Sequence, residues 1–142
     1  MKNQALLRNV CFAGNLGHGK TLLIDMLVQQ THIRKWDLDK NYRWMDSRYD
    51  EQDREMTIKM KTLSLLLPDF KDKNYVINII DTPGHPNLVG ELVAALRVSD
   101  GVALVVDVIE GVMMVDEKII RHIVRENLDI VVVINKIDRL IV

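Results

Sequence analysis

The chain has 142 residues, 48% of them hydrophobic and 27% charged, and its formal net charge is −1. These values fit one globular core and exclude a disordered or fibrous chain, and the near-zero charge argues against sequence-independent binding of nucleic acid. The apolar runs are too short to span a bilayer and no signal-peptide core is present, so we expect an intracellular protein with no membrane partner, in which the single cysteine, Cys11, is a buried hydrophobe.

An apolar strand is predicted over Arg8–Ala13, because nearly continuous apolar side chains suit a central strand that is covered on both faces. A helix is predicted shortly after it. We expect the apolar stripe of this helix to pack on the sheet. The stripe consists of Leu22, Leu23, Met26 and Leu27.

Residues 14–21, between this strand and helix, have the sequence GNLGHGKT and match G-x-x-x-x-G-K-[ST], the phosphate-binding loop. Glycines let backbone N–H groups turn toward phosphate oxygens, and the positive end of the following helix also attracts phosphate. A strand-to-helix turn that matches by chance is the weaker alternative. We expect phosphate binding by Gly14, Asn15, Gly17, Gly19, the backbone of His18, the ammonium of Lys20, and Thr21, whose hydroxyl is also an expected magnesium ligand.

From Thr31 to about Lys61 the sequence has no periodic pattern, and so long a connection within a compact domain is usually functional. We interpret it as a mobile loop. Arginine and aromatic residues alternate in it, which would allow stacking on nucleobases. The interleaved acidic residues favour a solvated loop, or one docked on a partner, instead.

Four more strands are predicted beyond this loop. The first two are joined by only seven residues, too few for a parallel crossover, so they should pair antiparallel. The other two each follow a helical pattern and should run parallel to the first strand. The predicted fold class is therefore α/β, a three-layer sandwich with a mixed, mostly parallel sheet of five strands. The strands are expected over Thr62–Leu67, Tyr75–Ile80, Val102–Asp107 and Ile130–Ile134, and the helices over Asn87–Val98 and Val115–Asn127.

Residues 81–85, DTPGH, follow the strand that ends at Ile80. Ligands of open α/β sheets bind at this carboxyl edge. Asp81 can hold magnesium there through a water molecule, and Gly84 lets its own N–H approach a terminal phosphate. On residue type alone His85 would be a solvent-facing loop histidine. Its position favours a catalytic role, because a neutral imidazole at that point can orient the attacking water.

Residues 135–138, NKID, close the last predicted strand at the same edge. The Asp138 carboxylate can accept hydrogen bonds from N1–H and the exocyclic amine of guanine, a pair of donors that adenine lacks. The three motifs together predict a guanine-nucleotide site, with Asn135 and Lys136 as further binding residues. The long loop then supplies Thr57, which is placed to reach magnesium and the terminal phosphate when the loop closes, so that loss of the phosphate would release the loop.

These residues resemble the translational GTPases of the elongation factor G and elongation factor 2 group. The resemblance extends from Arg8 to Asp138 and includes E-Q-x-R-x-x-T-I-K at Glu51–Lys59, which ordinary small GTPases lack. Several stretches resemble the elongation-factor-2-like GTPases of the spliceosomal U5 particle more than the ribosomal factors. They are residues 30–32, 67–69, 110–113 and 134–141. The chain departs from the family pattern at Gly17, Glu55, Pro86 and Leu88.

The resemblance implies a P-loop GTPase that binds GTP or GDP with Mg²⁺ and hydrolyses GTP slowly until a partner particle turns His85 toward the terminal phosphate. For partners it implies spliceosomal proteins and the U5 RNA particle in the nucleus, or alternatively the ribosome in the cytoplasm. A GTP-bound scaffold with little hydrolysis is a further alternative. Because the family has a sixth strand and additional domains, we expect residues 1–142 to be a partial GTP-binding domain, part of a longer chain with its remaining domains.

Overall fold

The computed structural model describes residues 6–31, 45–68 and 74–140, which form one five-stranded sheet with helices on both faces. In these ranges no helix is long and apolar enough to cross a membrane. The strands are β1 (Leu7–Ala13), β2 (Lys61–Pro68), β3 (Asn74–Asp81), β4 (Gly101–Asp107) and β5 (Asp129–Asn135). The helices are α1 (Lys20–Thr31), α2 (Tyr49–Arg54), α3 (Val89–Arg97) and α4 (Met114–Arg125), with 3₁₀ turns η2 (Pro86–Leu88) and η3 (Ile137–Leu140).

The strand order is β2-β3-β1-β4-β5. β1 runs parallel to β3 and β4, and β4 runs parallel to β5, whereas β2 is antiparallel to β3. The predicted α/β fold with a mixed, mostly parallel sheet is therefore confirmed. Parallel pairing brings the carboxyl ends of β1, β3, β4 and β5 to one edge, where the three sequence motifs follow β1, β3 and β5.

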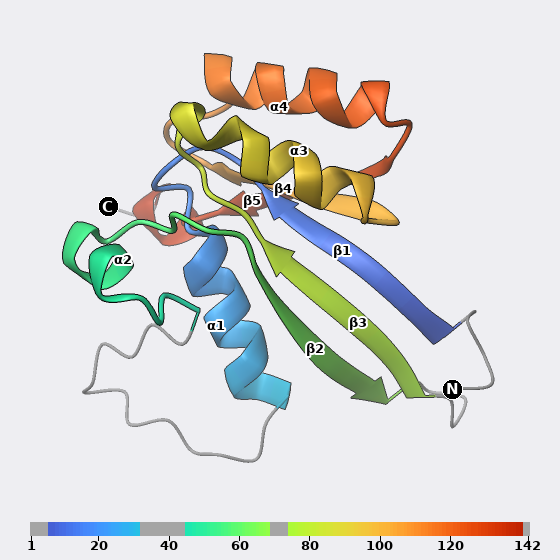
Figure 1. Cartoon of the computed structure of the whole chain (residues 1–142). Coiled ribbons are helices and arrows are strands. Elements are labelled where there is room, and N and C mark those ends of the chain that lie inside the picture. The colour runs from blue at the N-terminus through green and yellow to red at the C-terminus, as the bar shows by residue number, and fades with distance from the viewer. Residues whose placement is uncertain (1–5, 32–44, 69–73, 141–142) are drawn as a thin grey trace.

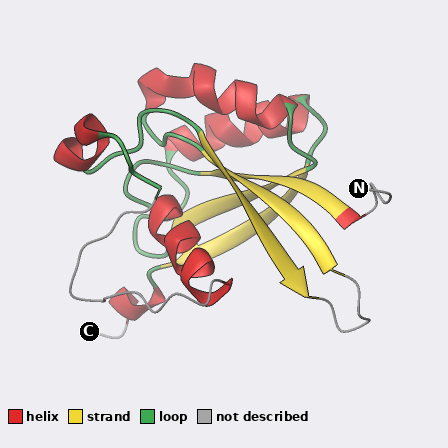
Figure 2. Cartoon of the chain, turned by 60° about the horizontal axis from the view of Figure 1, so that its bottom comes forward, coloured by secondary structure: helices red, strands yellow, loops and turns green. Residues whose placement is uncertain are grey.

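Three layers enclose two hydrophobic cores, because successive side chains of a strand point to opposite faces of the sheet. α3 and α4 cover one face and α1 covers the other (Figure 1). Cys11 and Ala13 of β1 belong to the core beneath α3 and α4, whereas Phe12 between them packs in the core beneath α1. β4 alternates in the same way and is buried almost throughout, as expected for a central strand covered on both faces. Figure 2 shows helices on both sides of the sheet.

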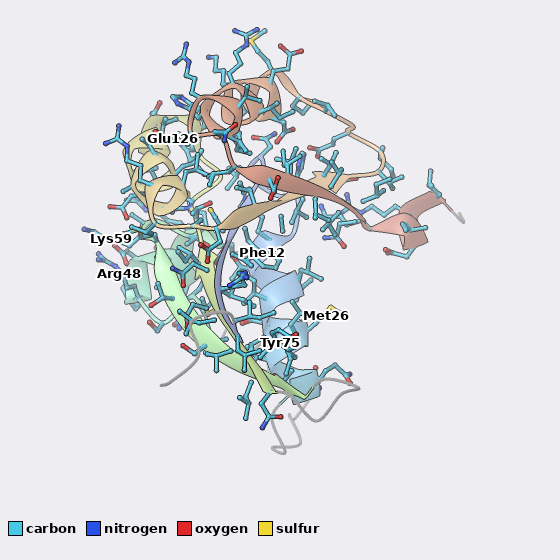
Figure 3. The ribbon with its side chains drawn as sticks, turned by 90° about the vertical axis from the view of Figure 1, so that its right-hand side faces the viewer. Phe12, Met26, Arg48, Lys59, Tyr75 and Glu126 are labelled. Carbon is cyan, nitrogen blue, oxygen red and sulfur yellow. The ribbon has the colours of Figure 1, made fainter. Side chains whose placement is uncertain are left out.

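The prediction that the apolar stripe of α1 packs on the sheet is wrong for most of its residues. Leu22 is 64% exposed and Met26 is 56% exposed, and Figure 3 shows Met26 projecting from α1 away from the sheet. The helix instead buries Ile24 and Val28 against the sheet. α1 carries apolar side chains on several sides, so periodicity alone does not select a face. The phosphate loop selects it, since it turns Lys20 inward, and residues at four-residue steps from Lys20 lie on the same face.

The interpretation of Thr31–Lys61 as a loop without secondary structure is also wrong in its described part. Residues 32–44 lie outside the described residues, as do residues 69–73 of the β2–β3 connection. Residues 49–54 form helix α2, and Met45, Glu51 and Thr57 are buried. Polar contacts within the segment, such as those of Glu51 with the N–H groups of Ile58 and Lys59, contribute to this order, and hydrophobic periodicity does not indicate contacts of this kind.

We expect Ile24→Ala to lower the free energy of unfolding by about 2–5 kcal/mol, because it removes a fully buried side chain from the core beneath α1. Leu22→Ala, on the exposed side of the same helix, should change it by less than about 0.5 kcal/mol. Urea unfolding of both variants measures this. Equal losses would contradict the assignment of the buried face.

Candidate functional site

The phosphate loop turns tightly between β1 and α1, and two of its glycines have no room for a side chain. Gly14 has φ 143°, and a Cβ atom added there would overlap the carbonyl oxygen of Val105 in β4. Gly19 has φ 87°, and a Cβ atom there would lie 2.5 Å from Nδ2 of Asn135. Both positions therefore require glycine, since other residues are strained at such φ values and would also clash.

The loop is also held from outside by α4. The buried Asp116 carboxylate accepts hydrogen bonds from the N–H groups of Asn15 (2.8 Å) and Met113 (2.9 Å), and the latter bond caps the helix. The buried His18 ring donates from Nδ1 to the carbonyl of Val105 at 3.1 Å, and its Nε2 lies 3.2 Å from Glu110 Oε2. The His18 side chain thus points into the protein, which leaves only its backbone for a ligand.

Lys20 places a buried ammonium group inside the loop. Its Nζ donates to the carbonyl oxygens of Gly14 and Asn15, both at 2.8 Å. Burial lowers the pKa of Lys20 to about 8, although the charges of Asp81 and Asp116 oppose this shift. No carboxylate in the described chain is hydrogen-bonded to this ammonium. Its environment therefore favours an anionic ligand, which would restore the stability of the charged form.

Thr21 of α1, Thr57 of the loop between α2 and β2, and Asp81 of β3 lie close together. The Thr21 hydroxyl donates to Asp81 Oδ2 at 2.8 Å and lies 2.9 Å from the Thr57 hydroxyl. Asp81 Oδ1 is buried and has no hydrogen-bond partner among the described residues, and burial raises the pKa of Asp81 to about 6. Because a buried polar atom without a partner is costly, this oxygen fits a cation or an ordered water. Two hydroxyl groups and a carboxylate are hard oxygen donors, which suits Mg²⁺.

Two further carboxylates of this region were not predicted from the sequence to belong to the site. Asp46 is buried and accepts a hydrogen bond from the Thr57 hydroxyl at 3.1 Å, and buried Asp25 of α1 accepts one from the N–H of Met45 at 3.2 Å. An acidic residue within the apolar helix was the available signal for Asp25, whereas Asp46 lies in a stretch without pattern. Their charges contribute to the raised pKa of Asp81, after burial.

Most of these groups line a cleft of about 250 Å³, whereas the fully buried Asp81 lies behind it and is bonded to the hydroxyl of Thr21. In the described ranges no three His, Cys, Asp or Glu side chains are arranged to hold a metal ion. A cation in the cleft would therefore depend on hydroxyl and phosphate oxygens as well as on Asp81. The lining residues come from the phosphate loop, α1, the segment around Thr57 and two strand ends, and are Leu16, Gly17, Gly19, Lys20, Thr21, Leu22, Asp25, Asp46, Glu55, Met56, Thr57, Gly84 and Lys136.

Gly84 packs directly on the phosphate loop, whereas His85 does not reach the cleft. A Cβ atom at Gly84 would lie 2.5 Å from Lys20 Nζ and 2.6 Å from the backbone nitrogen of Leu16. The His85 ring instead accepts a hydrogen bond from the N–H of Asn87 at 3.2 Å and caps η2. The expected position of this ring beside an attacking water is not found in this conformation, since the cap satisfies an otherwise unpaired N–H.

The NKID segment lies at the same sheet edge. Asn135 donates from Nδ2 to the carbonyl of His18 at 2.9 Å and so connects the end of β5 to the phosphate loop. Lys136 has φ 58° and its Nζ lies 2.8 Å from Asp107 Oδ2, at the end of β4. Asp138 is exposed in η3. The structure therefore places all three motifs side by side, with the Asp138 carboxylate open to a ligand.

Glu51 of α2 holds the backbone that follows Thr57, a role that the sequence alone did not indicate. Its buried carboxylate accepts the N–H groups of Ile58 (3.0 Å) and Lys59 (3.1 Å) and pairs with Lys61 Nζ. Burial alone would raise the pKa of Glu51, but Lys61 and the two N–H donors lower it. Glu55 ends α2 with φ 52°, a conformation that favours glycine.

We expect Glu51→Gln to lower the free energy of unfolding at neutral pH by about 3 kcal/mol, because the amide accepts fewer hydrogen bonds and leaves Lys61 without its counter-charge. The pKa of Glu51 is lowered by folding, so this contribution is present above its ordinary pKa, about 4.3, and is lost on acidification through the folded value.

Urea unfolding between pH 7 and pH 3 measures the difference between parent and variant, which should shrink at acid pH. Asp50→Asn is the matched control, since Asp50 pairs with Arg48 on the surface, where solvent screens the charges, and its loss should cost far less than that of Glu51. A pH-independent difference would rule out the ion pair as its cause.

A glycine loop between a strand and a helix, a buried lysine and a carboxylate at the next strand end define a P-loop nucleotide-binding domain. Residues 5–141 match the family of the elongation factor Tu GTP binding domain. The chain belongs to this family.

Related proteins agree with this assignment. The chain is 51% identical over 144 residues to the 110 kDa U5 small nuclear ribonucleoprotein component CLO of Arabidopsis thaliana, and the match covers 99% of this chain and 15% of that protein. It is 46% identical to pre-mRNA-splicing factor cwf10 of Schizosaccharomyces pombe (95% and 14% covered) and 38% identical to elongation factor 2 of Methanococcoides methylutens (99% and 19%). A crystal structure of a protein from Thermus thermophilus superposes with TM-score 0.83 at 26% identity over 95% of this chain and 20% of that one.

Proposed function

We propose that the chain is the GTP-binding and GTP-hydrolysing module of a protein that acts in pre-mRNA splicing as part of the U5 particle. The main support for a nucleotide site is that Thr21, Thr57 and Asp81 lie together next to the buried Lys20 ammonium. The splicing role is supported by the higher identity to the U5 component CLO and to cwf10 than to elongation factor 2.

In this proposal the nucleotide phosphates lie along the N–H groups of residues 14–21, with Lys20 paired to the outer phosphates. Thr21, Thr57 and Asp81 would hold Mg²⁺, which when bound neutralises charge on the phosphate oxygens. The unpartnered Asp81 oxygen and the raised pKa of Asp81 support this set of ligands. Guanine would lie at NKID, held by Asn135, Lys136 and the Asp138 carboxylate.

Hydrolysis requires a water molecule in line with the bond between the terminal phosphorus and its bridging oxygen. Water oxygen bonds to phosphorus, the bridging bond breaks, and the water proton passes to phosphate oxygen, which yields GDP and phosphate. His85 would orient this water after its ring leaves the N–H of Asn87. Because His85 starts outside the cleft, turnover without a partner should be slow.

The proposed partners are spliceosomal proteins and the U5 RNA particle, in the nucleus. Residues 1–142 would be a partial GTP-binding domain of a longer chain whose remaining domains contact it. β5, an edge of the described sheet, has its Val131, Val132 and Ile134 side chains exposed, which supports further chain on that edge. A ribosomal translocation factor of the elongation factor 2 type is the second candidate, favoured by the 38% identity to such a factor.

We expect Asp138→Asn to weaken GTP binding by about 3 kcal/mol and to favour xanthine nucleotide, whose C2 carbonyl can accept a hydrogen bond from the new amide. Competition binding with GTP, XTP and ATP measures this. Asp129→Asn, at the opposite end of β5, is the control and should leave all three affinities unchanged. If the parent binds ATP as tightly as GTP, the proposed guanine site is wrong.

We expect His85→Ala to preserve GTP affinity, because His85 does not line the cleft, and to remove particle-stimulated hydrolysis, by about a hundredfold or more. Single-turnover hydrolysis of bound GTP by the full-length protein, with and without the assembled particle, measures this. His122→Ala, in the last turn of α4, should behave as the parent does. If the particle stimulates neither form and both still support splicing, the protein is a GTP-bound scaffold rather than an enzyme in this process.

A further inference from the structure

Asp107, the last residue of β4, lies at the centre of a polar cluster behind the NKID segment. It has no solvent-accessible surface. Its Oδ1 accepts the N–H of Ile109 at 2.9 Å, and its Oδ2 lies 2.8 Å from Lys136 Nζ and 3.3 Å from Arg139 Nη1. One carboxylate therefore holds two cationic side chains that come from the same short segment.

These contacts constrain a strained turn. Lys136 has φ 58°, a left-handed conformation that is unfavourable for a residue with a side chain and persists only where its surroundings enforce it. The turn is closed by the Arg139 N–H, which donates to the Lys136 carbonyl at 3.0 Å. Asp107 thus holds both ends of the turn, and Asp138 lies between the two residues that it holds.

The cluster is also continuous with the phosphate loop. The Val108 N–H donates to the Asn135 carbonyl at 3.0 Å, and Asn135 Nδ2 donates to the His18 carbonyl at 2.9 Å. Lys136 itself lines the cleft. The end of β4 therefore sets the position of NKID relative to the loop that precedes α1.

The electrostatics of Asp107 favour a fully ionised carboxylate. The hydrogen bond from Lys136 and the N–H of Ile109 lower the pKa of Asp107 to about 2. Asp107 is therefore charged at every pH at which the protein would function, and its attraction for Lys136 and Arg139 is always present. A neutral side chain of the same shape would keep the N–H contact and lose the charge.

We propose that Asp107 is a positioning residue for guanine recognition, which holds Lys136 and Arg139 so that the Asp138 carboxylate meets N1–H and the 2-amino group of the base. This inference rests on the proposed guanine site. Asp107 does not contact the base in this arrangement; it acts through the turn that presents Asp138. Its effect should therefore depend on the base and not on the number of phosphates.

The test compares Asp107→Asn with the parent for binding of GTP, GDP and inosine triphosphate, which retains N1–H and lacks the 2-amino group. We expect GTP and GDP affinity to fall equally, by about tenfold, and inosine triphosphate affinity to fall less, so that the preference for GTP over inosine triphosphate is largely lost. Asp100→Asn is the matched control, since Asp100 precedes the same strand at the opposite edge of the sheet and is exposed. It should change none of these values.

Thermal unfolding without nucleotide checks that the variants are folded. Should Asp107→Asn not fold, Arg139→Met decides the question, because Arg139 is half exposed and its loss should shift the same preference in the same direction by a smaller factor. An unchanged preference for GTP over inosine triphosphate in the folded variant, with all affinities falling together, would overturn the positioning role. A parent that does not prefer GTP to ATP would instead overturn the guanine site itself.

Discussion

The constraint on which this structure depends is the burial of the Lys20 ammonium with no carboxylate of the described residues bonded to it. Burial disfavours the charged form, and the two carbonyl oxygens of the loop offset only part of that cost, as the lowered pKa of Lys20 shows. The acidic groups that act on it are bonded elsewhere: Asp81 accepts the Thr21 hydroxyl, and Asp116 accepts the Asn15 N–H. Lys20 is held in this position by the loop glycines, the inward face of α1 and the start of α4. A polyanionic ligand would pair with its ammonium there.

The buried acidic residues of the domain differ in how many hydrogen bonds their carboxylate oxygens accept, and this difference distinguishes their roles. Asp107 and Glu51 each accept several donors, and the pKa of each is lowered. Such carboxylates hold backbone and cationic side chains in place. Asp81 keeps one oxygen without a partner in the described structure, and its pKa is raised to about 6. The carboxylate with an unpartnered oxygen is thus the one bonded to the hydroxyl of Thr21, a residue that lines the cleft.

The segment that carries Thr57 is attached on two sides. Glu51 holds the N–H groups of Ile58 and Lys59, and the next residue, Met60, donates its N–H to Glu91 of α3 at 3.1 Å. α3 directly follows the turn that His85 caps. The segment that supplies Thr57 and the segment that supplies Gly84 and His85 are therefore joined by hydrogen bonds outside the cleft as well as meeting at Thr21 and Asp81.

The sequence by itself determined the five strands, their mixed direction and the three motifs at their carboxyl ends, because strand periodicity, short connections and glycine placement are local properties of a chain. It did not determine the buried face of α1, where Ile24 is buried and the expected Leu22 and Met26 are exposed. Nor did it predict helix α2. It also did not indicate that the carboxylates of Asp46, Glu51 and Asp107 are buried and hold neighbouring groups by hydrogen bonds. The buried face of α1 depends on the phosphate loop, which turns Lys20 inward. The carboxylates meet donors that lie outside their own helix or strand, such as Lys61 for Glu51 and Lys136 for Asp107. Only the packed tertiary structure brings such partners together and removes the water that would otherwise solvate them.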